Sequence, residues 1–380
     1  MRFFLYPFIL FFFCHCGRYM KEQPFDGNES IKKFLRAQIQ SGEFPAFQYV
    51  VVSPESELFN FSEGLSDIAK NSKITNRTTM MIYSMTKVIT AISILQLVGE
   101  EKIFLDDPVV KYLPEIPYGK EVKVRHLLSQ TSGIPNPIPL RWVHLREEHD
   151  RFDEQADLAS ILAEHPKLEF RPGFKYRYSN ISYWLLGRII TKVSGISFEE
   201  YVRTHILKRL GLKEKEADFI IPDSLYHAKG YLREWSLFDF LKSFLVDKKF
   251  IGRYENGWLA MNDHYMNGAS FGGMIASAQA VSKILQDLLK ENSKLLGKKE
   301  KHLLFERQKT SKGEPIEMSL GFHIGAVNER IYYFKEGGGA GFHGELRIYP
   351  KEKIATVIIV SNSAFDVDSL LNRLDGTFLK

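Results

Sequence analysis

The sequence predicts an α+β fold, in which helices flank an antiparallel sheet built from both ends of the chain. Two observations predict it. Five strand-like runs flank the middle of the chain, at residues 47–53, 58–62, 330–335, 344–349 and 354–360. Their short connections suit antiparallel pairing. Between them, residues of about 100–290 carry mostly helical periodicity broken by loops with Pro and Gly, which predicts an inserted helical lobe.

Composition sets the broad class. A chain of 380 residues with 44% hydrophobic and 26% charged residues can bury a large core. The net charge of +5 comes from mixed charges, and the densest basic run, residues 298–301, contains a glutamate. Such a run is typical of a solvated surface, so we expect no nucleic-acid partner.

The first residues form a separate segment. Arg2 precedes a short apolar run at residues 3–13, which indicates a signal peptide or lipoprotein signal over residues 1–19 and a mature domain over residues 20–380. The only cysteines are Cys14 and Cys16. Cys16 is a lipidation candidate, although bulky residues precede it. We therefore expect an exported protein, either periplasmic or held at the membrane through an N-terminal lipid anchor. The rest of the chain has no cysteine for a disulfide, a metal site or a nucleophile.

The elements follow in order. Residues 31–39 have the pattern of an amphipathic helix, and residues 47–53 and 58–62 that of a hairpin. A helix apolar on nearly every side follows at residues 84–98. Further helices are predicted at residues 179–194, 198–210, 275–289 and 366–378.

The apolar helix begins with a hydroxyl and an amine, Ser84 and Lys87, spaced one helical turn apart on one face. Burial lowers the pKa of a lysine, so Lys87 would accept the proton of Ser84, and the helix N-terminus would favour an alkoxide there. This pattern indicates an activated serine nucleophile. The alternative is that Ser84 caps the helix and Lys87 extends to solvent.

The loop before the helix at residues 179–194 carries Tyr178 and Asn180. A tyrosine beside cations has its phenolate favoured and can relay protons. An asparagine amide can bond both a lysine and a substrate carbonyl. The alternative is an ordinary helix cap made by Ser179 or Asn180, with Tyr178 packed on the surface.

A third candidate stretch, Lys335-Glu336-Gly337-Gly338, ends a predicted strand. Glycines let a substrate approach the backbone closely, and the N–H of Gly338 would form half of an oxyanion hole with that of Ser84. Lys335 would add positive charge to the cleft. The alternative is a flexible glycine-rich hairpin.

Together these motifs resemble the serine β-lactamases and penicillin-binding proteins, particularly the class C-like β-lactamase and esterase branch. The motifs S-x-x-K, Tyr-x-Asn and an altered Lys-Thr-Gly occur in that order as Ser84–Lys87, Tyr178–Asn180 and Lys335–Gly337. Flanking stretches are also similar to the family, at residues 105–114, 124–134, 170–173 and 319–322, and the resemblance spans roughly residues 30–365.

The resemblance implies a β-lactamase/transpeptidase-like fold and a serine hydrolase that acts on an ester, amide or β-lactam, as an esterase, β-lactamase or D-Ala-D-Ala carboxypeptidase would. Ser84 would be the nucleophile, activated by Lys87 and Tyr178, and Asn180 would position a small-molecule or peptide acyl substrate. It implies no metal or organic cofactor. The histidines of residues 144–149 lack a helical ligand spacing, and we expect them to face water. The alternative is a catalytically silent member that binds cell-wall or lipid-like ligands.

Glu336 departs from the family pattern, which has Thr or Ser there. A glutamate in the cleft would repel an anionic substrate. We therefore hypothesise that Glu336→Thr increases acylation by penicillins, unless the carboxylate turns away.

Overall fold

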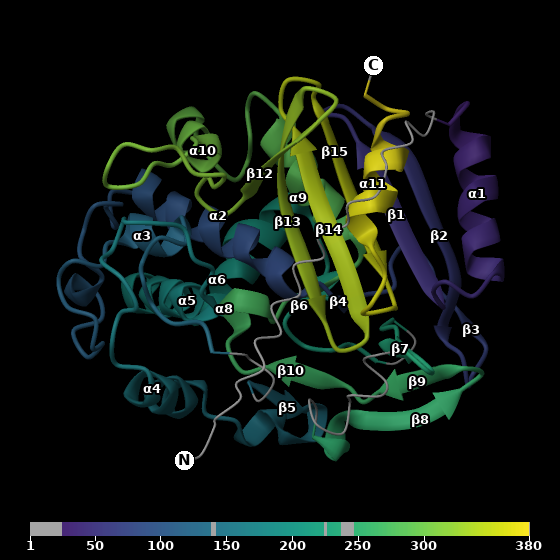
Figure 1. Cartoon of the computed structure of the whole chain (residues 1–380), viewed down its shortest axis with the longest axis horizontal. Coiled ribbons are helices and arrows are strands. Elements are labelled where there is room, and N and C mark those ends of the chain that lie inside the picture. The colour runs from purple at the N-terminus through teal and green to yellow at the C-terminus, as the bar shows by residue number, and fades with distance from the viewer. Residues whose placement is uncertain (1–24, 138–141, 224–225, 237–246, 380) are drawn as a thin grey trace, which may run out of the picture.

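A seven-stranded antiparallel sheet organises the protein (Figure 1). The computed structural model describes residues 25–137, 142–223, 226–236 and 247–379, so the signal segment and Cys16 lie outside it. In spatial order the strands are β12 (His323–Val327), β13 (Arg330–Gly339), β14 (Phe342–Tyr349), β15 (Ile354–Val360), β1 (Ala46–Val52), β2 (Glu57–Asp67) and β3 (Ser72–Lys73). Because β1 pairs with both β15 and β2, the two ends of the chain share one sheet, as the sequence predicts.

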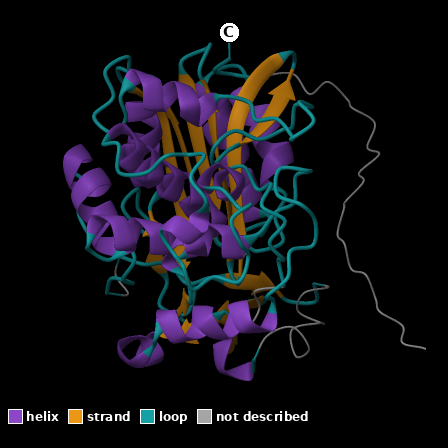
Figure 2. Ribbon diagram, turned by 90° about the vertical axis from the view of Figure 1, so that its left-hand side faces the viewer, coloured by secondary structure: helices purple, strands orange, loops and turns teal. Residues whose placement is uncertain are grey.

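The two faces of this sheet bury different cores. Helices α1 (Asn28–Gln40) and α11 (Val367–Asp375) cover one face, and α9 (Ala278–Leu289) and the helical part of the molecule cover the other (Figures 1 and 2). Alternate residues of β1 divide accordingly: Phe47 and Tyr49 pack toward α1 and α11, whereas Ala46 and Val50 join the larger core. This is the alternation expected of a strand buried on both sides.

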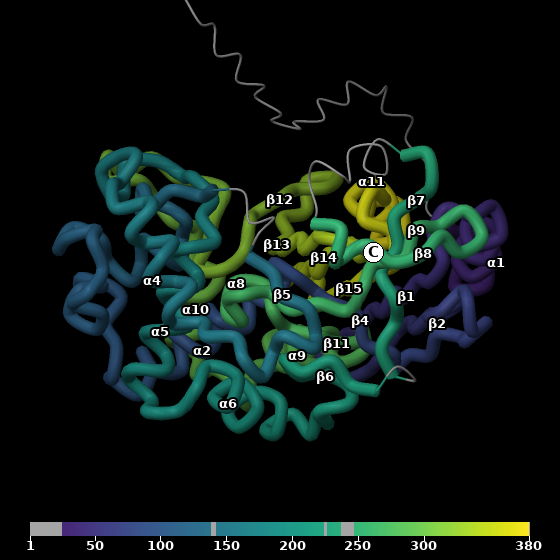
Figure 3. Tube along the Cα trace, turned by 90° about the horizontal axis from the view of Figure 1, so that it is seen from below, coloured from purple at the N-terminus to yellow at the C-terminus, as the bar shows by residue number. Residues whose placement is uncertain are grey.

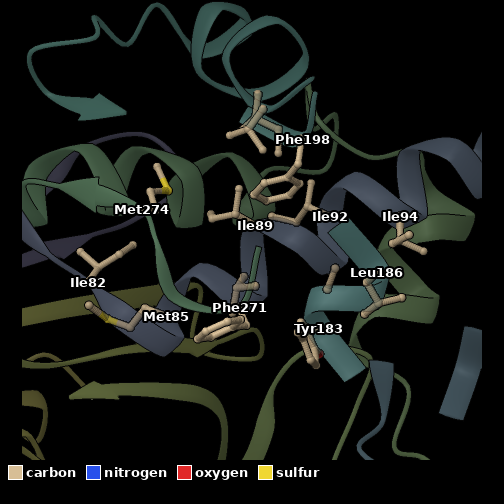
Figure 4. Packing of buried hydrophobic residues seen from close by; sticks show 14 of the residues in the cluster. Ile82, Met85, Ile89, Ile92, Ile94, Tyr183, Leu186, Phe198, Phe271 and Met274 are labelled. Atoms are coloured by element: carbon tan, nitrogen blue, oxygen red, sulfur yellow. The ribbon is translucent and has the colours of Figure 1, made fainter. Parts of the chain in front are cut away.

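The larger core surrounds α2 (Thr86–Gly99). It is covered by α3 (Val124–Leu128), α5 (Asn180–Ser194), α6 (Phe198–Val202), α8 (Ala269–Gly272) and α10 (Lys298–Phe305). Ile89 and Ile92 of α2 pack among apolar side chains of these helices, including Phe198 and Phe271 (Figure 4). Residues 86–97 of α2 are all buried, so the pattern that predicts an apolar helix is confirmed.

Several short strands within residues 100–290 escape the sequence prediction. One small sheet holds β7 (Tyr231–Arg233), β9 (Trp258–Met261) and β8 (Ile251–Glu255), and a second pairs β5 (Val143–Leu145) with β10 (His264–Met266). They lie at the lower end of Figure 1 and face the viewer in Figure 3. Strands of three to five residues show too few alternations to be recognised from sequence.

The predicted elements otherwise agree with the structure, with local differences. The segment predicted as one helix at 275–289 begins as β11 (Ile275–Ala276), which pairs with β4 (Met80–Met81) and β6 (Ala217–Asp218), and only then becomes α9. The helix predicted at 198–210 is α6 followed by a π turn and a 3-10 turn. Helix α4 (Glu154–Glu164) follows a loop and is capped by Asp153, which accepts from two backbone N–H groups.

Candidate active site

Ser84 lies in a 3-10 turn, Tyr83–Met85, immediately before α2. The sequence interpretation placed Ser84 at the start of the helix itself, and the structure moves that start to Thr86. Tyr83 has a positive φ of 43°, which is uncommon outside glycine and marks a sharply bent backbone. Because of this bend the chain leaves β4 and enters α2, and Ser84 lies at the N-terminal end of that buried helix.

Lys87 is 0% exposed and its ammonium nitrogen meets three oxygens. Nζ lies 2.6 Å from the carbonyl oxygen of Phe271, 2.8 Å from Asn180 Oδ1 and 3.0 Å from Ser84 Oγ. Burial lowers the pKa of Lys87 well below that of a free lysine, and the charge of Lys335 lowers it further. A neutral amine has two N–H donors and one lone pair, which match two carbonyl oxygens and one hydroxyl. The side chain is therefore arranged to accept the proton of Ser84.

Tyr178 completes the contacts of the serine. Its hydroxyl lies 2.7 Å from Ser84 Oγ, and its ring lies 4.9 Å from Lys87 Nζ and 4.6 Å from Lys335 Nζ, measured to the ring centroid. The expectation that neighbouring cations favour the phenolate is wrong for this geometry. Burial raises the pKa of Tyr178, so the residue is a neutral phenol and a proton donor when the site is empty.

Asn180 is the first residue of α5, with Ser179 as its N-cap. The Asn180 amide oxygen accepts from Lys87, and the Asn180 backbone N–H donates to Asn136 Oδ1 at 2.9 Å. Ser179 therefore caps the helix, while Tyr178 contacts Ser84 and Asn180 contacts Lys87. The cap interpretation is thus confirmed for Ser179, and the catalytic role of Tyr178 and Asn180 stays a prediction.

Strand β13 brings the third motif against the serine. A Cβ atom on Gly337 would lie 2.1 Å from the carbonyl oxygen of Ile82 and 3.1 Å from the backbone nitrogen of Ser84, so only glycine allows this approach. Gly338 follows in the strand and pairs with His343 of β14. The glycines are thus strand residues rather than a flexible hairpin, and the chain turns only at residues 340–341.

Lys335 lies on the Gly337 side of β13, and only 3% of it is exposed. Burial lowers the pKa of Lys335 to about 7, although the charge of Glu336 acts in the opposite direction. The predicted positive charge is consequently present in only part of the molecules at neutral pH. The charge of Lys335 therefore changes in the physiological pH range.

Glu336 is directed away from Lys335 and Gly337, because successive side chains of a strand leave opposite faces. Its carboxylate accepts from His343 Nε2 at 2.5 Å, and His343 Nδ1 lies 2.6 Å from the carbonyl oxygen of Phe365. The hydrogen bond to His343 lowers the pKa of Glu336. Burial alone would lower the pKa of His343, but Glu336 outweighs that effect and the pKa is raised. The carboxylate is therefore held by His343 on the face of β13 away from Lys335, which argues against its repelling an anion inside the cleft.

The sequence missed three contributors to the site. The carbonyl oxygen of Phe271, in α8, holds Lys87 and has no side-chain signature. His323 Nε2 lies within hydrogen-bond distance, 3.1 Å, of the Tyr176 hydroxyl. Burial and the charge of Lys335 keep the pKa of His323 well below its usual range. Glu336 and His343 form a pair that is recognisable only once β13 and β14 are in register.

His144 does not face water, contrary to the expectation for the histidines of residues 144–149, and His149 is half-buried. His144 is 5% exposed; its ring lies 2.9 Å from both Asn267 Oδ1 and His149 Nδ1 and stacks on Phe152. These rings line a hollow of about 300 Å³ that Ala269 of α8 also lines. Among the described residues, no group of three or more metal-ligating side chains is arranged to hold an ion.

No helix within the described ranges has the length and apolar character that crossing a bilayer requires.

The chain is similar to several known proteins. Protein flp of Staphylococcus aureus strain MW2 is 29% identical over 211 residues, 54% of this chain, and the match spans only 41% of flp, about two fifths of its length. Penicillin-binding protein 4* of Bacillus subtilis strain 168 is 24% identical over 86% of this chain and 70% of its own. The solved structure of D-amino acid amidase from Ochrobactrum anthropi SV3 superposes with a TM-score of 0.76 at 19% identity, over 92% of this chain and 98% of that one, which shows a shared fold.

The fold is thus the α+β fold of β-lactamases and transpeptidases, as the resemblance implies. The family model described as Beta-lactamase matches residues 31–375, a range that contains the serine, the lysine, the tyrosine and the glycine strand described above. The chain belongs to the beta-lactamase family.

Proposed function

We propose that the protein is a serine hydrolase that forms an acyl-enzyme on Ser84 with an ester, amide or β-lactam substrate. Family membership supports a hydrolase-like function in general terms. The observation that carries the specific proposal is the set of three contacts of Lys87, which leaves its lone pair for the proton of Ser84.

In the first step, Lys87 takes the proton of Ser84 as Oγ attacks the carbonyl carbon. The backbone N–H groups of Ser84 and Gly338 bind the oxyanion that forms. Tyr178, a neutral phenol, donates its proton to the leaving amine or alkoxide, and the Lys87 ammonium returns a proton to Tyr178. Water then attacks the acyl group, with the same residues moving the proton in reverse.

Asn180 and Lys335 hold the two sides of this site. Asn180 fixes Lys87 through its amide oxygen and leaves its NH2 group for a substrate carbonyl. Lys335 covers the ring of Tyr178 and supplies positive charge when protonated. A silent ligand-binding role is not favoured, because burying a lysine with a complete set of proton-transfer contacts has no benefit for binding alone.

The test is intact mass after exposure to a fluorophosphonate. Ser84 Oγ would form a bond to phosphorus and Lys87 would take the proton of Ser84, while the phosphorus–fluorine bond breaks and Tyr178 donates a hydrogen bond to the departing fluoride. We expect one adduct on the parent and none on the Ser84→Ala variant, at equal thermal stability. A parent that is folded yet unlabelled would overturn the proposal. A panel of a nitrophenyl ester, a D-amino acid amide and a penicillin then ranks the substrates, the amide being included because of the amidase structure.

We also propose, from the sequence alone, that the protein is exported and that its acyl substrates are met outside the cytoplasm, without nucleic-acid partners. The signal over residues 1–19 supports export, and Cys16 supports an N-terminal lipid anchor. The mass of the N-terminal peptide of the mature protein checks both: a diacylglyceryl group on Cys16 supports the anchor, and an intact residue 1 contradicts cleavage.

A further inference from the structure

We propose that Gln130 is the positioning residue for Tyr178, and that it sets the distance between the phenol and Ser84. The inference rests on the proposed function, since it assigns a role to the motif at residues 124–134 that the chemistry above leaves unused. Gln130 lies just beyond α3 and is 1% exposed. Its hydrogen bonds within the described residues reach neither Ser84 nor Lys87.

Gln130 binds the backbone on both sides of Tyr178. The N–H of Arg177 donates to the main-chain oxygen of Gln130 at 2.8 Å, and the N–H of Ser179 donates to its side-chain Oε1 at 2.7 Å. One residue thus holds the two peptide groups that bracket the tyrosine. A single hydrogen bond would leave the segment free to rotate, whereas two bonds to one residue fix the direction in which the phenol leaves the backbone.

The residues after Gln130 extend this support to the neighbours of Tyr178. The Ser179 hydroxyl donates to the carbonyl oxygen of Pro135 at 3.0 Å, and Asn136 Oδ1 accepts from the N–H of Asn180. These two bonds fix the start of α5. Only the pair made by Gln130, however, brackets Tyr178 itself, because Arg177 lies before it in the chain and Ser179 after it.

Gln130 is held at a cost to the fold, which points to a functional constraint at this position. Its φ of 58° lies in the left-handed region that non-glycine residues seldom occupy. Its buried Nε2 has no hydrogen-bond partner among the described residues. Strained backbone and unsatisfied buried donors are rare in proteins and concentrate at functional sites. The side-chain amide has a use even so, because its oxygen Oε1 accepts from the N–H of Ser179.

The position of the phenol matters because proton transfer requires hydrogen-bond distance. The Tyr178 hydroxyl now lies 2.7 Å from Ser84 Oγ. Loss of the Oε1 acceptor would release the Ser179 peptide and let the ring move away from Ser84. A misplacement of about 1 Å can reduce a rate by about 100-fold, and so we expect Gln130→Met, of similar volume, to label about 10- to 100-fold more slowly.

The experiment measures fluorophosphonate labelling of Ser84, separating the binding constant from the maximal rate. For Gln130→Met we expect the maximal rate to fall and the binding constant to stay within about twofold, because Gln130 does not touch the reagent. The matched control is Gln96→Met. Gln96 is also buried, with Nε2 bonded to two backbone oxygens, but it lies near the far end of α2. It should lose stability while labelling at the parental rate.

A double-mutant cycle separates positioning from general loosening. In a Tyr178→Phe background, Gln130→Met should slow labelling by less than about twofold, because the group that it positions is gone. An equal slowing in both backgrounds, or a parental rate for the single variant, would overturn the inference. If the Met variant does not fold, Gln130→Asn withdraws the carbonyl by one methylene and is expected to show the same pattern. A parent that is not labelled fails the proposed function instead.

Discussion

Lys335 is the residue through which pH should control the site. Its pKa of about 7 means that its charge is lost as the pH rises through neutrality, and that charge also lowers the pKa of Lys87. Two titrations should therefore shape the acylation rate: loss of the Lys87 proton raises it, and loss of the Lys335 charge near pH 7 lowers it.

For Lys335→Met we expect two changes in the pH profile of acylation. The fall near pH 7 disappears, because the group that titrates there is absent. The rising limb moves to higher pH, because the Lys87 ammonium no longer meets a neighbouring cation. The profile is measured with a neutral ester, so that substrate charge plays no part. A variant whose two limbs coincide with the parent's would contradict this assignment.

Glu336 tests whether the altered third motif sets substrate charge preference. Since its carboxylate is bound by His343 on the other face of β13, Glu336→Thr should change the acylation rates of a neutral ester and an anionic penicillin by the same factor, within about threefold. Glu336→Gln is the matched control, as it keeps the shape and removes the charge. A gain confined to the penicillin would restore the repulsion hypothesis.

At the scale of elements, the site depends on how closely β13 approaches the turn before α2. Gly337→Ala places a methyl group 2.1 Å from the carbonyl oxygen of Ile82, so the strand must shift. We expect a loss of about 1–3 kcal/mol in the free energy of unfolding and a loss of fluorophosphonate labelling larger than that instability explains. The control is Gly376→Ala, where the new methyl group meets only ordinary contacts of 3.6 Å. Equal labelling of both variants would contradict the need for close approach.

The elements that the sequence predicts are those with long, regular patterns. Helix α2 is recognisable because its sequence is apolar on nearly every side, and β1 and β15 because each is a largely apolar run bounded by turns. The motif residues Ser84, Lys87 and Tyr178 are likewise visible as a spaced pattern, and the structure brings them into contact.

What the sequence could not predict depends on contacts between distant segments. The carbonyl of Phe271 acts through its backbone, so no residue type signals it. The raised pKa of Tyr178 follows from the depth of its burial, which outweighs the cations visible in the sequence. Glu336 leaves the cleft because of strand pleat and because His343, seven residues later, lies across the hairpin. These three features depend on how distant segments pack, on strand register and on the depth of burial.

At the scale of the whole molecule, a buried charge network joins the sheet to α11. Arg347 of β14 is 0% exposed and binds Glu345 beside it and Asp368 and Asp375 of α11. We expect Arg347→Met to destabilise the protein by about 3–5 kcal/mol, because it leaves buried carboxylates without their cation. Thermal and urea unfolding measure this. Replacing Arg36, whose pair with Glu63 is exposed, should cost under about 1 kcal/mol; comparable losses would contradict the network's role.

The position of β1 between β15 and β2 has a consequence for synthesis. A nascent chain carries Ser84 long before the ribosome has made residues 335–360, so strand β1 and the turn Tyr83–Met85 lack their neighbours β15 and β13 until those residues have been made. An unpaired strand is prone to aggregation during that interval, and a chaperone would protect it. A product truncated before residue 335 would lack the strand that brings Gly337 against Ser84.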